Sequence, residues 1–227
     1  MSEKTTNSGA RIKVTRNGPY IVTGRVPLSE QIIVVDAKGD AVAWREGRVY
    51  PEQETYALCR CGKSKTMPFC DGTHARTGFI GTETASRAPY VEQSRVIEGP
   101  GVKLTDAVAL CASARFCKRA DGVRKLTLLS DQPEAKRLAI EESVLCPAGR
   151  LVAWTKDNQP VEPDLVPSIG LIEDPQVGTS GPIWVRGCIP IEAADGTLWE
   201  TRNRVTLCRC GKSGNMPFCD GSHIPEH

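Results

Sequence analysis

Cys59-Arg-Cys-Gly-Lys-Ser-Lys-Thr-Met-Pro-Phe-Cys-Asp-Gly-Thr-His74 recurs near the end of the chain as Cys208-Arg-Cys-Gly-Lys-Ser-Gly-Asn-Met-Pro-Phe-Cys-Asp-Gly-Ser-His223. Both stretches have the spacing C-x-C-x8-C-x3-H, so three cysteines and one histidine stand at matching positions. Thiolate and imidazole are the donors that soft and borderline metals prefer. The duplication therefore predicts two equivalent metal sites in a tandem repeat.

The duplication extends upstream of these stretches. Gly18-Pro-Tyr-Ile-Val-Thr-Gly-Arg-Val-Pro-Leu28 aligns with Gly181-Pro-Ile-Trp-Val-Arg-Gly-Cys-Ile-Pro-Ile191. From Gly18 to Cys59 is 41 positions, and from Gly181 to Cys208 is 27, so the first repeat holds 14 extra residues. We expect these to form a longer hairpin around residues 36–40. Cys188 aligns with Arg25 and lies outside the shared set of donors.

Local patterns predict the main elements. Short β-branched runs bounded by Gly, Pro or Asn predict strands at 12–14, 20–23, 31–35 and 183–186. Residues 202–208 alternate polar and apolar side chains, so we expect a strand that delivers Cys208 at its end. A helix is predicted over 130–145, capped by Ser130 or Asp131, with Pro133 in its first turn. Its predicted buried stripe consists of Leu138, Ala139, Ile140 and Val144.

These elements predict a mainly β fold with a small α+β insert. We expect a first β-rich domain at 10–90, a middle domain at 100–155 and a second β-rich domain at 168–227, joined by a proline-containing linker. The duplicated strands predict a pseudo-two-fold packing of the two β-rich domains within one chain. The protein is then expected to be a monomer that contains an internal pseudo-dimer.

Composition narrows the setting. The chain has ten cysteines and a formal net charge of +2, from 29 basic and 27 acidic residues. It begins without an apolar signal region and has no run near the ~18 apolar residues of a membrane helix, so we expect a soluble, cytoplasmic protein. Thiols stay reduced there, and clustered cysteines are more often metal ligands than disulfides. The interspersed charges give no support for nucleic-acid or membrane binding.

The motif also has a predicted geometry. The C-x-C pair places two thiols on the same side of an extended segment, whereas the third cysteine and the histidine are four apart, as on one helix turn. Asp71 and Asp220 are candidate caps of such a helix, whose amino end would favour an anionic group. The hydroxyls of Ser64 and Ser213 either donate to the bound group or close a local turn, with their repetition favouring the former. Four basic residues flank the motifs and either tune the site or are solvated: Arg60, Lys63, Arg209 and Lys212.

The C-x-C pair, Pro68 or Pro217, and Cys70-Asp-Gly-Thr-His74 or Cys219-Asp-Gly-Ser-His223 resemble the CDGSH iron–sulfur domain (NEET) family. Thr73 departs from the family serine but keeps the hydroxyl. The resemblance implies two [2Fe–2S] clusters, each held by three cysteines and one histidine. The implied ligands are Cys59, Cys61, Cys70 and His74 in the first repeat, and Cys208, Cys210, Cys219 and His223 in the second. A structural zinc site with the same donors remains the alternative, although C-x-C is tighter than the usual zinc spacing.

The middle domain has a third group of cysteines. Cys111 and Cys117, with Ala114 between them, and Cys146 followed by Pro147 resemble a divergent single-cluster ferredoxin segment. The resemblance implies a [3Fe–4S] cluster, or a [4Fe–4S] cluster with one non-cysteine ligand. The alternative is a cluster-free segment whose thiols are buried as small hydrophobic groups.

These observations predict an iron–sulfur protein of electron transfer or cluster handling, with unidentified redox protein partners. A sensor whose cluster state controls partner binding is the alternative of a different class. An enzyme has little support, because no nucleotide-binding glycine loop and no further histidine suited to base catalysis are visible.

Overall fold

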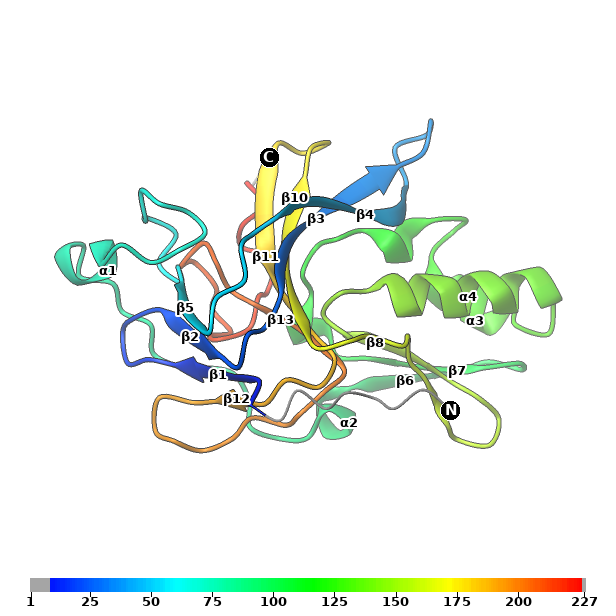
Figure 1. Cartoon of the computed structure of the whole chain (residues 1–227). Helices are drawn as coiled ribbons and strands as arrows, with labels where there is room; N and C mark the ends of the chain where they lie inside the picture. Colours follow the sequence, from blue (N-terminus) through cyan, green and yellow to red (C-terminus); the bar gives the residue numbers. More distant parts are fainter. Residues whose placement is uncertain (1–8, 226–227) are drawn as a thin grey trace.

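The strands of the two repeats are interleaved (Figure 1). The structure, a computed structural model, describes residues 9–225. One four-stranded sheet has the order β12-β1-β2-β5, in which β12 comes from the second repeat and the other strands from the first. The bounds are β1 Arg11–Val14, β2 Tyr20–Thr23, β5 Thr55–Leu58 and β12 Ile191–Glu192.

The second large sheet consists mainly of strands from the second repeat and includes strands from the first. Its order is β13-β11-β10-β3-β4, with three strands from the second repeat and the hairpin β3–β4 from the first. The bounds are β3 Leu28–Val35, β4 Ala41–Val49, β10 Ser168–Asp174, β11 Thr179–Arg186 and β13 Arg204–Leu207. The β3–β4 hairpin turns at 36–40, so the prediction of a longer hairpin there is confirmed.

Backbone pairing relates the two repeats by a pseudo-two-fold rotation. β1 pairs in parallel with β12, and β10 pairs in parallel with β3. Ile12 N donates to Pro190 O over 2.9 Å, and Ile169 N donates to Pro27 O over 2.8 Å. Since Pro27 and Pro190 are equivalent in the alignment of the repeats, each repeat supplies the same strand to the sheet of the other. The strands predicted at 12–14, 20–23, 31–35 and 183–186 lie within β1, β2, β3 and β11, and β13 occupies the middle of the predicted 202–208.

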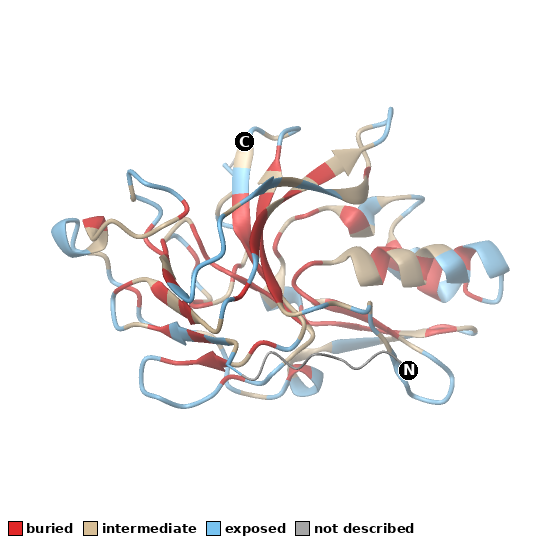
Figure 2. Cartoon of the chain, in the orientation of Figure 1, coloured by how far each residue is buried: buried red, intermediate tan, exposed pale blue. Residues whose placement is uncertain are grey.

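One hydrophobic core draws on both repeats (Figure 2). Alternate residues of β1 and β2 are buried, as the two-residue period of a half-buried strand requires. Ile12 from the first repeat and Ile169 and Ile183 from the second are fully buried in the same cluster. Burying a side chain of this size contributes about 1.5–3 kcal/mol. The sheets of the two repeats therefore stabilise each other.

The middle segment is a small α+β layer beside these sheets (Figure 1). Its sheet has the order β6-β7-β8-β9, and α3 and α4 lie along it. The order β7, α4, β8 matches the predicted strand–helix–strand segment. The bounds are α2 Tyr90–Gln93, β6 Arg95–Glu98, β7 Lys103–Asp106, η1 Val108–Leu110, η2 Phe116–Lys118, α3 Val123–Leu128, α4 Pro133–Leu145, β8 Leu151–Trp154 and β9 Pro160–Val161.

Helix α4 corrects two predictions. Pro133 lies in the first turn as expected, but the helix begins there and not at 130, and the preceding Gln132 does not cap it with its side chain. Ser130 instead accepts hydrogen bonds from Gly101 N and Val102 N, a tertiary contact that removes it from capping. The buried stripe is also different from the prediction, because small residues let the helix approach β8 and α3 closely. It consists of Ala135, Ala139, Glu142 and Ser143, while Leu138, Ile140 and Val144 are half-buried.

Candidate metal centres

Each ligand motif returns to the strand from which it starts. β13 ends at Leu207 and delivers Cys208, as predicted, and β5 ends at Leu58 and delivers Cys59 in the same way. Cys59 N donates to Pro68 O over 2.8 Å, and Cys70 N donates to Ala57 O over 2.9 Å. The second motif repeats both bonds, from Cys208 N to Pro217 O and from Cys219 N to Thr206 O, at 2.8 and 2.9 Å. The return places the third cysteine beside the C-x-C pair.

The C-x-C thiols form one donor pair in each motif. The Sγ atoms of Cys59 and Cys61 are 3.7 Å apart, and those of Cys208 and Cys210 are also 3.7 Å apart. Two thiolates on one tetrahedral ion, with metal–sulfur bonds of about 2.3 Å, lie about 3.8 Å apart. Each pair therefore matches two positions on one tetrahedral metal.

The third cysteine and the histidine form the other donor pair. Cys70 Sγ lies 3.3 Å from His74 Nδ1, and Cys219 Sγ lies 3.5 Å from His223 Nδ1. A thiolate and an imidazole nitrogen on one tetrahedral ion lie about 3.6 Å apart. Within residues 9–225, no group of three or more His, Cys, Asp or Glu side chains is placed to hold a single ion. The structure thus brings the eight predicted ligands together as four pairs, one Cys–Cys pair and one Cys–His pair in each motif.

The predicted helix between the third cysteine and the histidine is wrong in its extent. α1 spans Thr73–Arg76, so Cys70 lies before it, and the second motif has only turns at the same place. A helix dipole therefore does not act on the site. Its place is taken by two backbone amides, because Gly72 N and Gly221 N each donate to the Sγ of the preceding ligand cysteine, Cys70 or Cys219, over 3.4 Å.

The aspartate after the third cysteine ties the motif loop to the histidine turn. The Asp71 carboxylate accepts from Thr73 N at 2.9 Å and from Lys65 N at 3.0 Å. Asp220 does the same with Ser222 N and Gly214 N. The amide donors from Lys65 and Thr73 hold the pKa of the Asp71 carboxyl well below its ordinary value. The predicted capping role is thereby replaced by a loop clamp.

The serines and arginines of the motifs have structural roles. Ser64 Oγ donates to Phe69 O over 2.6 Å and Ser213 Oγ donates to Phe218 O over 2.7 Å, so both close a local turn, and the favoured donation to the bound group is wrong. Arg60 and Arg209 are buried, which overturns their solvated interpretation. Arg60 donates to two backbone carbonyls, and Arg209 to two carbonyls and to Glu173. Lys63 and Lys212 are exposed.

Burial sets the protonation of the second site. It raises the pKa of the Cys219 thiol to about 12 and lowers the pKa of His223 below its ordinary value. The hydrogen bond from Cys210 lowers the pKa of Cys208 to about 6. His223 is accordingly the neutral imidazole, which is the form that binds metals. The Cys219 thiol requires a bound cation to become the thiolate.

The two motifs meet at their C-x-C segments. Cys61 and Cys210 form an antiparallel bridge between the repeats. A Cβ on Gly62 would lie 2.4 Å from Cys210 O, and one on Gly211 would lie 2.6 Å from Cys61 O. Both glycines also have positive φ, so the meeting of the motifs requires glycine at these positions. A polar hollow of about 490 Å³ beside this bridge is lined in part by Cys210.

A third group of thiols lines a separate hollow in the middle segment. Cys111, Cys117 and Cys146 all border one hollow of about 510 Å³, so the structure brings together the three cysteines grouped by sequence. Ala114 also borders it and packs against Phe116 in a neighbouring apolar cluster. Burial raises the pKa of the Cys117 thiol to about 11. The hollow is large enough for a group of several heavy atoms, and its three thiols are soft donors.

Sequence reasoning missed two residues of these sites. Arg150 borders the three-cysteine hollow and is oriented by Asp106, which accepts from its Nε and Nη2 at 2.6 and 3.0 Å. Burial alone would lower the pKa of Arg150. Hydrogen bonds with Asp106 and attraction to Cys111 outweigh burial and raise the pKa above its ordinary value, so Arg150 stays cationic beside the thiols. Tyr20 of the first repeat donates to Cys208 O and Pro217 O of the second. No local pattern marks either residue, because their partners are distant in sequence.

Comparison with known proteins agrees with this arrangement. A family model described as an iron-binding zinc finger of CDGSH type matches residues 17–75 and 180–224. A second, described as a divergent 4Fe-4S mono-cluster, matches residues 97–156. No curated protein matches the chain, and no helix within residues 9–225 is long and apolar enough to cross a membrane. Two domains of the iron-binding CDGSH type therefore flank a divergent 4Fe-4S mono-cluster segment in this chain.

Proposed function

We propose that each CDGSH repeat holds one [2Fe–2S] cluster by three cysteines and one histidine. The pairing of the donors carries this proposal. A binuclear cluster needs two donors on each of two irons, and each motif offers one Cys–Cys pair and one Cys–His pair at tetrahedral spacing. The ligands are the eight residues predicted from sequence: Cys59, Cys61, Cys70, His74, Cys208, Cys210, Cys219 and His223.

We further propose a third cluster in the middle segment, held by Cys111, Cys117 and Cys146. The three thiols line one hollow, and the cationic Arg150 beside them offsets the negative charge of an assembly of thiolates and sulfide. Three cysteine ligands suit a [3Fe–4S] cluster, or a [4Fe–4S] cluster with one ligand of another kind.

Such clusters supply one-electron redox chemistry when bound. The surrounding residues hold the donors in place, since backbone amides donate to Cys70 and Cys219 and the buried Arg60 and Arg209 fix the motif backbone. The first site is partly open to solvent at Cys70 and His74. The function that this supports is electron transfer or iron–sulfur cluster handling with a protein partner, in a chain that is monomeric and contains its own pseudo-dimer.

Metal analysis of the anaerobically purified protein tests the proposal. We expect about four irons and about four acid-labile sulfides from the two repeats, with further iron from the middle segment, and the visible and electron-paramagnetic spectra of iron–sulfur clusters. Replacing Cys70 and His74 by Ser and Ala should remove about two irons and leave the rest. Two zinc ions per chain without labile sulfide would refute the proposal in favour of structural zinc.

A further inference from the structure

We propose that the second CDGSH site and the three-cysteine hollow form one two-cluster centre, and that the first CDGSH site makes no such contact with the hollow. This inference rests on the proposed function, because it requires both sites to be filled. It comes from a comparison of two motifs that have nearly the same sequence but different surroundings.

The ligands of the second site and of the hollow share one packing cluster. Cys219 is 2% exposed and packs with Ala112 and Ala148 of the middle segment, and Cys146 packs against the same cluster. Ile224, the residue after the ligand His223, borders the hollow together with its three cysteines. The Cys219–His223 end of the second site therefore lies directly against the hollow.

The equivalent glycines Gly221 and Gly72 also differ in what lies next to them. At Gly221 an added Cβ would lie 2.6 Å from Ser113 Oγ and 3.3 Å from Cys111 O, both in the loop that carries the hollow. At Gly72, the equivalent position of the first repeat, nothing lies within 4 Å. The contact with the middle segment therefore does not follow from the motif sequence, which is nearly the same in both repeats. Only the second copy of the motif is packed against the cysteine loop.

Polar contacts from the second repeat hold this packing in place. Asn215 Nδ2 donates to Ala109 O over 2.9 Å, and Arg204 Nη1 donates to the carbonyl of the hollow residue Cys146 over 2.6 Å. Arg204 is 1% exposed, so its bonds form out of water, where loss of a partner is costly. The equivalent of Asn215 in the first repeat is Thr66, whose hydroxyl bonds only within its own motif loop.

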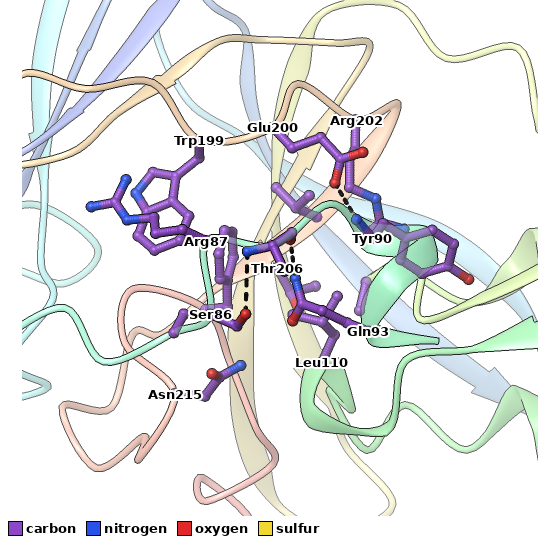
Figure 3. Close-up of a pocket in the computed structure, with 15 residues that line it drawn as sticks. Ser86, Arg87, Tyr90, Gln93, Leu110, Trp199, Glu200, Arg202, Thr206 and Asn215 are labelled. Atoms are coloured by element: carbon purple, nitrogen blue, oxygen red, sulfur yellow. Dashed lines mark hydrogen bonds between the residues drawn. The ribbon is translucent and has the colours of Figure 1, made fainter. Parts of the chain in front are cut away.

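The segment that follows the first repeat closes over the second motif. Thr84 N and Ala85 N both donate to Met216 O over 2.9 Å, and Met216 is 4% exposed, whereas its equivalent Met67 is 45% exposed. Figure 3 shows the joint: Glu200 of the second repeat accepts from Tyr90 N over 2.7 Å. The cavity that remains between these residues has a volume of about 30 Å³, room for about one water molecule, so the segment packs closely against the second repeat here.

The first site lies away from the middle segment. In Figure 1, α1, which carries His74, lies at the periphery of the molecule on the side away from α3 and α4. The two CDGSH motifs touch through Cys61 and Cys210, so the second site lies between the first site and the hollow. The contact at Cys61 is a backbone bridge to Cys210, whereas Cys219, in the other donor pair of the second site, packs with residues of the middle segment.

Magnetic interaction tests the inference, because paramagnetic clusters whose ligands pack together broaden each other's spectra and relax faster. One protein carries Cys70→Ser with His74→Ala and retains the second site and the hollow. Its matched counterpart carries Cys219→Ser with His223→Ala and retains the first site and the hollow. Cys146→Ser is then added to each, and iron analysis establishes that the cluster of the hollow has been lost.

We expect Cys146→Ser to narrow the reduced spectrum of the second site and to raise its saturation, with the microwave power at half-saturation falling several-fold. The spectrum of the first site in the matched protein should not change. Cys111→Ser, which removes a different cysteine of the hollow, should reproduce both results, so a folding defect of one variant does not decide the outcome.

Three results would separate the possible failures. An unchanged second-site spectrum after the hollow is emptied, or an equal change in the first site, would overturn the two-cluster centre. A wild-type hollow without iron, beside two filled CDGSH sites, would also overturn it while leaving the CDGSH assignment intact. Absence of iron and sulfide from the whole protein would instead overturn the proposed function.

Discussion

Glu142 in α4 is a buried carboxyl group whose charge should set the pH dependence of stability. Its side chain is fully buried, and within the described part of the chain neither carboxyl oxygen has a hydrogen-bond partner. Burial raises its pKa from 4.5 to about 8; Arg119 acts against the rise, and the nearby Glu141 and Asp40 add to it. The folded protein therefore keeps this group protonated at neutral pH.

The sign and size of the effect follow from this pKa. Below pH 4.5 the group is protonated in both the folded and the unfolded chain, so its contribution is complete there. Between pH 4.5 and about 8 the folded chain binds a proton that the unfolded chain releases, so stability falls as the pH rises. At about 1.4 kcal/mol per pKa unit, the loss across this window is roughly 4–5 kcal/mol.

Glu142→Gln should remove this loss, because the amide stays uncharged at every pH. Urea unfolding from pH 5 to 9, followed by tryptophan fluorescence at equal iron content, measures the difference between the two proteins. Trp44 reports on this region, since its Nε1 donates to Leu145 O at the end of α4. The variant should match the wild type near pH 5 and exceed it by several kcal/mol near pH 9.

Glu141→Gln is the matched control. Its carboxylate is part-exposed and forms ion pairs with Arg119 and Arg137. Exposed pairs contribute about 1 kcal/mol or less, so this variant should be slightly less stable. It should keep most of the wild-type fall in stability with pH, because burial is the largest cause of the raised pKa of Glu142 and the charge of Glu141 a smaller one. If the difference between Glu142→Gln and the wild type is the same at pH 5 and pH 9, the carboxyl does not titrate in this window and the reasoning is refuted.

Further predictions concern the CDGSH motifs and the assembly. Replacing either ligand histidine by cysteine should retain the cluster but lower its potential in a redox titration, because thiolate donates more charge than imidazole. Gly62→Ala should lower the melting temperature and the retained iron more than Gly72→Ala does. Both glycines have positive φ, but only at Gly62 would the added Cβ meet a carbonyl oxygen, Cys210 O at 2.4 Å. Equal losses in the two variants would contradict this contact. Peroxide should oxidise Met67 well before Met216, as mass spectrometry of peptides can show, because Met67 is 45% exposed and Met216 4%. Light scattering should give the mass of one chain, and an obligate dimer would contradict the internal pseudo-dimer.

Most strands could be predicted because their signals are local. The alternation of buried and exposed residues in β1 and β2 follows from the geometry of a half-buried strand, and the hairpin at 36–40 follows from the 14 extra residues of the first repeat. The predicted place of Pro133 in the first turn of α4 is confirmed for the same reason, although the helix begins three residues later than expected. Features that depend on φ preference and short-range periodicity need no knowledge of the rest of the chain.

Predictions of side-chain roles were wrong where the hydrogen-bond partner is distant in sequence. Ser130 bonds to the amides of Gly101 and Val102 and not to α4. Arg60 was predicted either to tune the site or to be solvated, but the chain folds over it and its guanidinium binds the backbone carbonyls of Thr15 and Gly81. Hydrogen-bond partners are chosen by the tertiary fold, because buried polar groups must be paired by whichever group lies nearest.

The sequence by itself determined the duplication, the two sets of candidate ligands and the strands that present them, since each is carried by residues close together in the chain. Only the tertiary structure decided that the two copies are unequal. Gly221 faces the loop of Cys111 and Ser113, while Gly72 faces nothing. Two copies of a motif share their internal geometry, but burial and electrostatic surroundings come from the elements packed against them, and the middle segment packs against the second copy.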